Sequence, residues 1–132
     1  MLRLELYCKS KNIKFFVMYE YKAKLKRVVD GDTLDLIIDM GFKTTTEQRV
    51  RLKGIDTPET WRRKKDSEEY KQGMISKEYV VKRLKDNNNV MIARTDKHPG
   101  MYGRYIVDII LADSDISLND ELLQKGLAKV WK

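Results

Sequence analysis

Four of the acidic residues in one stretch of the chain, residues 27–59, fall at the ends of apolar runs, and Arg51 lies in the same stretch. Strands stop where apolar runs stop, so side chains from different strands can converge there. Arg51 lies within this stretch, between two groups of acidic residues. Carboxylates and an arginine brought together in this way indicate a divalent metal beside a phosphate. The acidic residues, in chain order, are Asp30, Asp32, Asp56 and Glu59.

The segment DGDTLD, residues 30–35, invites comparison with the calcium-binding loop of an EF-hand. That loop requires an oxygen ligand at its fifth position and glycine at its sixth. This chain has Leu34 and Asp35 at those positions. The sequence therefore excludes an EF-hand, and the acidic side chains of this segment need distant partners to bind a metal.

Three strands are expected to position these residues. Alternation of apolar and polar residues predicts strands over residues 21–29, 33–40 and 49–55, with a polar loop over residues 42–48. The sequence DGD joins the first two strands as a hairpin turn, in which Gly31 can adopt a positive φ. The apolar faces predicted for the second and third strands consist of Leu34, Leu36, Ile38, Val50 and Leu52.

Two helices are expected later in the chain. The first covers residues 67–85, with Asp66 as its predicted N-cap and Glu69 as the reciprocal member of a capping box. The second is short, capped by Ser117 and ended by Gly126. The predicted buried face of the first helix consists of Tyr70, Met74, Lys77, Val81 and Leu84, flanked by Gly73 and Val80.

Two more strands, over residues 90–94 and 104–111, separate these helices. Three strands, a helix, two strands and a helix form the pattern of a five-stranded OB-fold barrel. We therefore predict an α+β, mainly β domain over residues 20–132 with two or three peripheral helices. Residues 1–19 are predicted to be an N-terminal extension to which the sequence assigns no clear structure. Fold alone does not establish function.

The composition indicates one domain with an anionic partner. With 132 residues, of which 42% are hydrophobic, the chain can form one core. A net charge of +7 favours nucleic acid as partner, although many soluble proteins are equally basic. Cys8 is the only cysteine, so no intramolecular disulfide can form. We find no signal-peptide pattern and no apolar run near the roughly 18 residues of a membrane span, so we expect a cytoplasmic protein without membrane contact.

Four motifs carry a resemblance to a known family, namely VVDGDTLDL, RVRLKGIDTPE, YGR and LLQKGLAKV. They occur in the order and approximate spacing of the staphylococcal nuclease (thermonuclease) family, which the chain resembles over residues 21–131. The resemblance implies an OB-fold phosphodiesterase that uses calcium to hydrolyse DNA and RNA, leaving 3′-phosphates. Because the chain stops at Trp131 and Lys132, directly after the last motif, we expect it to lack the family's final helix and tyrosine-bearing stretch.

The resemblance implies that Asp32 and Asp56 bind calcium through their carboxylates, with the main-chain carbonyl of Thr57 beside them. These are the hard oxygen ligands that calcium requires. Two carboxylates and a carbonyl leave coordination positions for water and for a phosphate oxygen. The alternative for Asp32 is a simple turn residue, and we expect Asp30 to shape the turn.

Glu59 resembles the family residue that orients the attacking water, and whether it acts as a general base is left open. Its alternative is capping near Pro58. Arg51 and Arg104 resemble the two arginines that clamp the phosphate, because a planar guanidinium can bind two phosphoryl oxygens at once. An exposed strand arginine is otherwise only a solvated side chain.

Further substrate contacts are expected on both sides of the site. Tyr102 resembles the family tyrosine that packs beside the nucleotide, with a structural ring as the alternative. A run of cations borders the family's active site and is expected to follow the phosphate backbone. This run consists of Arg62, Arg63, Lys64 and Lys65.

We therefore expect a calcium-dependent, sequence-nonspecific nuclease that acts on DNA, with RNA left open as a second substrate, and that is a monomer. Such a site reads phosphate and metal geometry and makes no use of base edges. One alternative is a non-catalytic OB-fold module that binds nucleic acid or another protein, but such modules typically lack the acidic and arginine set found here. A metal-stabilised structural domain is a second alternative, which leaves the arginines unexplained.

Overall fold

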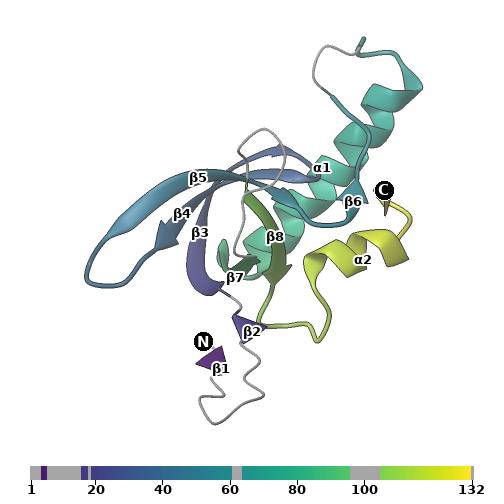
Figure 1. Cartoon of the computed structure of the whole chain (residues 1–132). Helices are drawn as coiled ribbons and strands as arrows, with labels where there is room; N and C mark the ends of the chain where they lie inside the picture. The colour runs from purple at the N-terminus through teal and green to yellow at the C-terminus, as the bar shows by residue number, and fades with distance from the viewer. Residues whose placement is uncertain (1–3, 6–15, 18, 61–63, 96–104, 132) are drawn as a thin grey trace.

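A closed barrel of five strands forms the centre of the protein (Figure 1). The structure is a computed structural model and describes residues 4–5, 16–17, 19–60, 64–95 and 105–131. The strands follow the order β3-β4-β5-β8-β7, and every neighbouring pair is antiparallel except β5 and β8. The predicted mainly β, OB-fold-like barrel is confirmed. Its strands are β3 (Tyr19–Asp30), β4 (Thr33–Asp39), β5 (Thr45–Leu52), β7 (Val90–Thr95) and β8 (Tyr105–Ile110).

Alternation along the strands builds the barrel core, as the sequence predicts. Leu34 and Leu36 of β4 are buried, and so are Val50 and Leu52 of β5. The register pairs Leu34 with Val50, so these two apolar faces meet inside the barrel. Arg51, between two inward residues, points away from this core.

Strand β5 begins earlier than the sequence predicts. It starts at Thr45, so the loop predicted over residues 42–48 is wrong in its second half. The first residues of β5 pair with the second half of β4 in a long hairpin (Figure 1). Thr46 and Gln48 are half-buried there, and the Gln48 amide donates a hydrogen bond to the Thr46 hydroxyl at 3.0 Å. Polar residues suit this part of the strand because it borders an open cavity.

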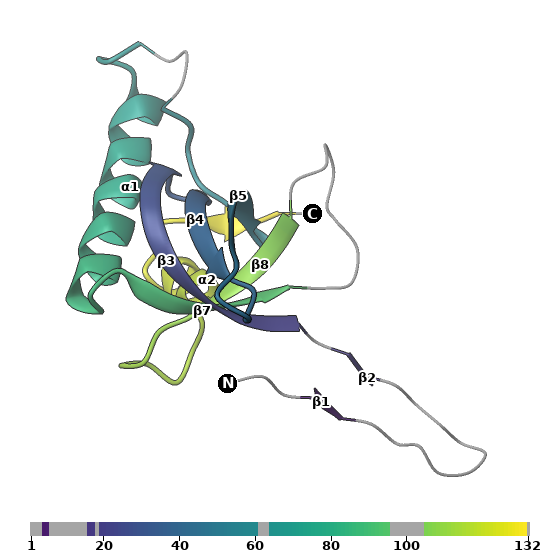
Figure 2. The ribbon, with the colours of Figure 1, turned by 90° about the vertical axis from the view of Figure 1, so that its left-hand side faces the viewer.

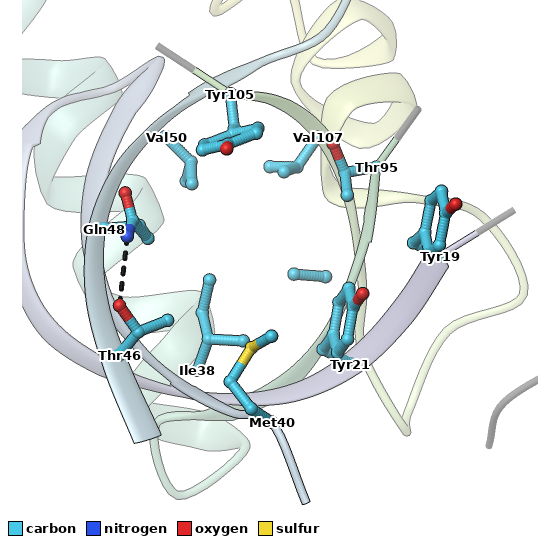
Figure 3. A pocket seen from close by; sticks show the side chains of 11 residues that line it. Tyr19, Tyr21, Ile38, Met40, Thr46, Gln48, Val50, Thr95, Tyr105 and Val107 are labelled. Atoms are coloured by element: carbon cyan, nitrogen blue, oxygen red, sulfur yellow. Dashed lines mark hydrogen bonds between the residues drawn. The ribbon is translucent and has the colours of Figure 1, made fainter. Parts of the chain in front are cut away.

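The barrel is hollow at this end, where a cavity of about 440 Å³ opens between the strands (Figure 3). Tyr19, Tyr21 and Tyr105 line it together with aliphatic and neutral polar side chains. Strand β4 has seven residues, and seven strand residues span roughly 20 Å. The hairpin end of the cavity is therefore remote from the turn that joins β3 to β4.

Helix α1 (Glu68–Asp86) packs against β3 along one side of the barrel (Figure 2). Its N-cap is Ser67, whose hydroxyl accepts a hydrogen bond from the Tyr70 N–H at 3.2 Å. The predicted N-cap, Asp66, is therefore wrong by one residue. Ser67 has the extended backbone that a cap requires, with φ −73° and ψ 150°.

The buried face of α1 is rotated from the predicted one. Val81 is 42% exposed, although the apolar pattern predicts that it is buried. A Cβ added to Gly73 would lie only 2.6 Å from the Pro58 carbonyl oxygen, so the helix approaches the segment after residue 56 too closely for large side chains there. Small residues therefore form half of the contact. The buried residues of α1 are Gly73, Ser76, Val80 and Leu84.

Helix α2 (Leu118–Gln124) begins as predicted. The hydroxyl of its N-cap, Ser117, accepts a hydrogen bond from the Asp120 N–H at 3.1 Å. Gly126 follows the helix with φ 72°, a left-handed conformation that ends helices.

The buried side chain of Asn119 ties α2 to the barrel. Its Oδ1 accepts a hydrogen bond from the Ile109 N–H at 3.1 Å. Its Nδ2 donates to the carbonyls of Val107 and Lys53 at 3.0 and 2.9 Å. The second of these carbonyls belongs to the turn that carries the chain out of β5, where Gly54 has φ 75°. One side chain therefore fixes a helix, a barrel strand and a turn.

An ionic network joins the two helices. The guanidinium of Arg83 donates two hydrogen bonds to the Asp113 carboxylate, both at 2.9 Å, and its Nε donates to Glu121 at 2.6 Å. The Tyr79 hydroxyl donates to the same Glu121 oxygen. Burial, together with this bond, raises the pKa of Tyr79 to about 12. Burial, the largest single influence, would raise the pKa of Glu121, but the hydrogen bonds from Arg83 and Tyr79 and the charge of Arg83 together outweigh it and hold this pKa below its usual 4.5.

Two short ladders lie outside the barrel. Strand β6 (Ile55–Asp56) pairs with β9 (Lys129–Val130) in antiparallel orientation. Strand β1 (Leu4–Glu5) pairs with β2 (Phe16–Val17), within the predicted N-terminal extension. The part of the chain that the structure describes has α1 and α2 as its helices, and neither has the length and hydropathy needed to span a membrane.

Replacing Asn119 with alanine should lower the free energy of unfolding by about 3 kcal/mol, because buried backbone groups would lose their hydrogen-bond partner. Urea denaturation at neutral pH measures this. Gln124→Ala, at an exposed position of the same helix, is the matched control and should stay within about 0.5 kcal/mol of the wild type. Equal urea midpoints for the two variants would contradict the role of Asn119.

The Arg83 network should make stability depend on acid pH. A carboxyl group whose pKa is lowered in the folded state stabilises the fold above its ordinary pKa and loses this effect as pH falls through the folded pKa. Glu121, whose ordinary value is 4.5, and Asp113, whose pKa is lowered mainly by the Arg83 hydrogen bonds, both follow this rule. We therefore expect the wild-type melting temperature to fall steeply below about pH 4.5.

Arg83→Met should flatten this acid-side fall, because it removes the group that lowers both pKa values. Lys82→Met, at the neighbouring exposed position, should keep the wild-type slope. Melting temperatures measured from about pH 2 to pH 6 make the comparison. Parallel curves for the two variants would count against the network.

Candidate active site

The turn between β3 and β4 presents Asp32, which is only 5% exposed. Its Oδ1 accepts a hydrogen bond from the Thr33 hydroxyl at 3.0 Å, and its Oδ2 accepts one from the Thr57 N–H at 3.1 Å. The second bond comes from a segment distant in the sequence. The carboxylate is therefore held between the turn and the chain that follows β6.

Arg51 bridges two carboxylates. Its Nη1 lies 3.3 Å from Asp32 Oδ2, and its Nη2 lies 3.2 Å from Asp56 Oδ1. Nη2 also donates to the Ile55 carbonyl at 3.3 Å. The register explains this position, because Arg51 pairs with Thr33, the residue directly after Asp32. Both carboxylates are thus within reach of one cationic group, whose side chain is only 17% exposed.

Crowding around Gly31 holds the turn against its neighbours. A Cβ at this position would lie 3.0 Å from side-chain carbons of both Thr57 and Ser76. Gly31 does not use the positive φ open to it, because the described glycines with positive φ are Gly41, Gly54 and Gly126. Glycine is required here because the turn, the segment after β6 and helix α1 meet within van der Waals distance.

The segment after β6 is fixed at both ends. The Thr60 hydroxyl donates a hydrogen bond to Asp30 Oδ1 at 2.6 Å, which joins this segment to the β3–β4 turn. The Pro58 carbonyl packs against Gly73 of α1. Glu59 lies between these two anchors with an exposed side chain. Its backbone is therefore held although the residue itself is exposed.

Within the described residues, no group of three or more His, Cys, Asp or Glu side chains gathers as a metal site. The acidic pair of Asp32 and Asp56 would need main-chain and solvent oxygens to complete a coordination shell. The Oγ1 of Thr57, buried beside this pair, has no hydrogen-bond partner among the residues that the structure describes. Asp56 also lines an open cavity of about 420 Å³, between the first turn of α1 and residues 126–129, so one carboxylate is reachable from outside.

Several predicted site residues lie outside the described part of the chain, namely Arg62, Arg63, Tyr102 and Arg104. Lys64 and Lys65 are exposed just before α1. Strand β8 begins at Tyr105, which pairs with Val50, the residue before Arg51. The structure thus brings together Asp32, Arg51, Asp56 and Thr57 and places Glu59 in the adjoining segment.

Sequence reasoning missed Trp131. The Arg51 guanidinium carbon lies 5.2 Å from the centre of its ring, over the ring face. The backbone N–H of Trp131 donates a hydrogen bond to the Gly54 carbonyl at 3.0 Å, directly after the pairing of β9 with β6. No local pattern signals this contact, because it depends on a pairing between segments far apart in the chain.

Comparison with known proteins gives three informative relatives. Thermonuclease of Staphylococcus intermedius is 35% identical over 105 residues, which cover 80% of this chain and 56% of the relative. Uncharacterized protein MJ1439 of Methanocaldococcus jannaschii is 32% identical over 129 residues, covering 84% and 59%. Endonuclease YhcR of Bacillus subtilis is 28% identical over 115 residues, covering 85% and 9%. The chain thus spans little more than half of the first two relatives and a small part of the third.

A family profile gives the assignment. The profile described as "Staphylococcal nuclease homologue" matches residues 49–132, well over half of the chain, and this range includes Arg51, Asp56 and Glu59. The closed barrel agrees with this match, and so does the order of the four motifs in the sequence. The chain therefore belongs to the staphylococcal nuclease family.

Proposed function

We propose that this chain is a nuclease that hydrolyses phosphodiester bonds of DNA, with RNA as a second substrate class, without sequence preference and leaving 3′-phosphates. The observation that carries the proposal is the bridge of Arg51 between Asp32 and Asp56. An arginine held at the edge of an acidic pair can meet a phosphate beside a metal. Nuclease names among the relatives agree with this chemistry.

We propose calcium as the cofactor, held by the carboxylates of Asp32 and Asp56 and the carbonyl of Thr57. The fit rests on the guanidinium, which shows that a positive group can lie against both carboxylates at once. The donor set consists of oxygens alone, which suits a hard cation. When bound, calcium would neutralise charge on the phosphate and polarise its oxygen.

The protein's own residues would do the remaining work. Arg51 would donate two hydrogen bonds to phosphoryl oxygens and stabilise the charge that develops on them during attack. Glu59 would orient the attacking water, since its carboxylate is exposed on a segment whose backbone is fixed. Arg104 would complete the clamp as the residue before β8, a strand that pairs with β5 beside Arg51.

Residues beyond the acidic pair are also proposed to contact the substrate. Tyr102 would pack beside the nucleotide, and the cations of residues 62–65 would follow the phosphate backbone. We also propose that residues 1–19 form an extension, that residues 20–132 form the nuclease domain, and that the protein is a monomer. The alternative of a non-catalytic binding module gains no specific support, because the acidic pair and its arginine are assembled.

Arg51→Lys should lower the cleavage rate by roughly 100- to 1,000-fold, since a point donor replaces a planar fork that stabilises the transition state. Plasmid cleavage in calcium measures the rate, and thermal melting checks the fold. Arg49→Lys is the matched control, because Arg49 lies on the same strand in an exposed pair with Asp35. Near wild-type turnover in Arg51→Lys would refute the clamp.

Cleavage of plasmid and RNA should stop in excess EGTA and return with calcium. Asp56→Asn should weaken calcium binding by at least about tenfold in calorimetric titration, because it removes one charge from the acidic pair. Asp39→Asn, at an exposed position at the end of β4, should bind calcium like the wild type. Full activity in the chelator, or equal affinities in the two variants, would sink the calcium proposal.

A further inference from the structure

Trp131 covers one face of the group that bridges the acidic pair. The centre of its ring lies 5.2 Å from the Arg51 guanidinium carbon, within the range of a cation–π interaction. The edges of the same guanidinium contact Asp32 and Asp56. Arg51 is thus held on its edges by charge and on its face by an aromatic ring.

The position of Trp131 follows from backbone pairing. Strand β9 pairs with β6, so that Val130 lies opposite Ile55 and Lys129 opposite Asp56. The hydrogen bond from the backbone N–H of Trp131 to the Gly54 carbonyl extends this pairing by one residue. The tryptophan is therefore anchored to the same short strand that presents Asp56.

Arg51 makes two kinds of contact, those that use the proposed calcium ligands and those that do not. Those with Asp32 and Asp56 use the oxygens that we propose for calcium, so a cation bound there competes with the guanidinium for them. Among the described residues, the Ile55 carbonyl and the Trp131 ring are the contacts of Arg51 that use neither carboxylate. An arginine side chain without such support gains rotamer freedom and leaves the geometry needed for a phosphate.

We infer that Trp131 is a positioning residue, which keeps the Arg51 guanidinium aimed at the phosphate when the carboxylates are occupied by a cation. The inference rests on the proposed function for its purpose, but the contact itself can be tested without catalysis. The cation–π geometry predicts that an aromatic ring is needed at this position and that an aliphatic side chain cannot replace it. Trp131, directly after the β6–β9 ladder, thereby supports the phosphate-binding group with a single side chain.

Trp131→Leu should lower kcat/KM for plasmid cleavage roughly 3- to 30-fold, because it keeps apolar bulk and removes the ring quadrupole. Trp131→Phe should restore most of the loss, since a ring is present again. Val130→Ala, at an exposed position of the same ladder, should stay within about twofold of the wild type. A Leu variant as active as the Phe variant would overturn the inference.

A double-mutant cycle measures the contact in calcium-free protein. Trp131→Leu, Arg51→Met and the combined variant are compared by urea denaturation in EGTA. The two substitutions should be coupled by roughly 2- to 30-fold in the unfolding equilibrium constant. Additive effects would overturn the inference, even if the protein is a nuclease. Coupling in a protein without nuclease activity would leave the contact established and refute the proposed function.

Fluorescence follows the indole directly. The chain has two tryptophans, so the measurement uses a Trp61→Phe background in which Trp131 is the remaining tryptophan, excited at a wavelength that tyrosine does not absorb. Calcium added to the EGTA-treated protein should shift its emission, because the guanidinium beneath the ring loses its ionic partners. The shift should disappear in Arg51→Met. An unchanged shift in that variant would show that the ring does not respond to the arginine.

Discussion

The bridge of Arg51 between Asp32 and Asp56 fixes three segments relative to one another. Adjacent carboxylates repel, and a nearly buried one such as Asp32 is costly without a cationic partner. The β3–β4 turn, β5 and β6 must therefore keep their register, since a shift of one residue would turn Arg51 into the apolar interior. The apolar alternation of β4 and β5 and this charge contact specify the same register. Packing and electrostatics are thus mutually consistent at this point of the fold.

Close backbone approach holds the bridge in place. Gly31 and Gly73 lie where a methyl group would collide with Thr57, Ser76 or Pro58. The turn, the segment after β6 and helix α1 consequently form one packed unit. Helix α1 is also connected elsewhere, through Arg83 to α2, and α2 is connected through Asn119 to the barrel. The acidic pair is held by much of the domain and does not depend on a single loop.

The sequence was sufficient for features that depend on local pattern. Alternation put Val50 and Leu52 on the apolar face and so left Arg51 outside the core, and Ser117 and Gly126 marked the two ends of α2. Prediction from the sequence failed where a feature depends on contacts between segments far apart in the chain. The face of α1 was misjudged because Gly73 and Ser76 are small residues whose importance comes from what approaches them. Asn119 and Trp131 act through backbone partners far along the chain, and no spacing rule can reveal these.

The parallel pairing of β5 with β8 that closes the barrel predicts an order in which the site assembles during folding. Strands β3, β4 and β5 are neighbours in sequence and can pair through short turns, so Asp32 and Arg51 can meet early. Pairing of β5 with β8, and of β6 with β9, closes long loops around α1 at an entropic cost. Proteins rich in such pairings fold in milliseconds to seconds. The aromatic cover of Arg51 is therefore expected to form in the slowest step, after its ionic contacts.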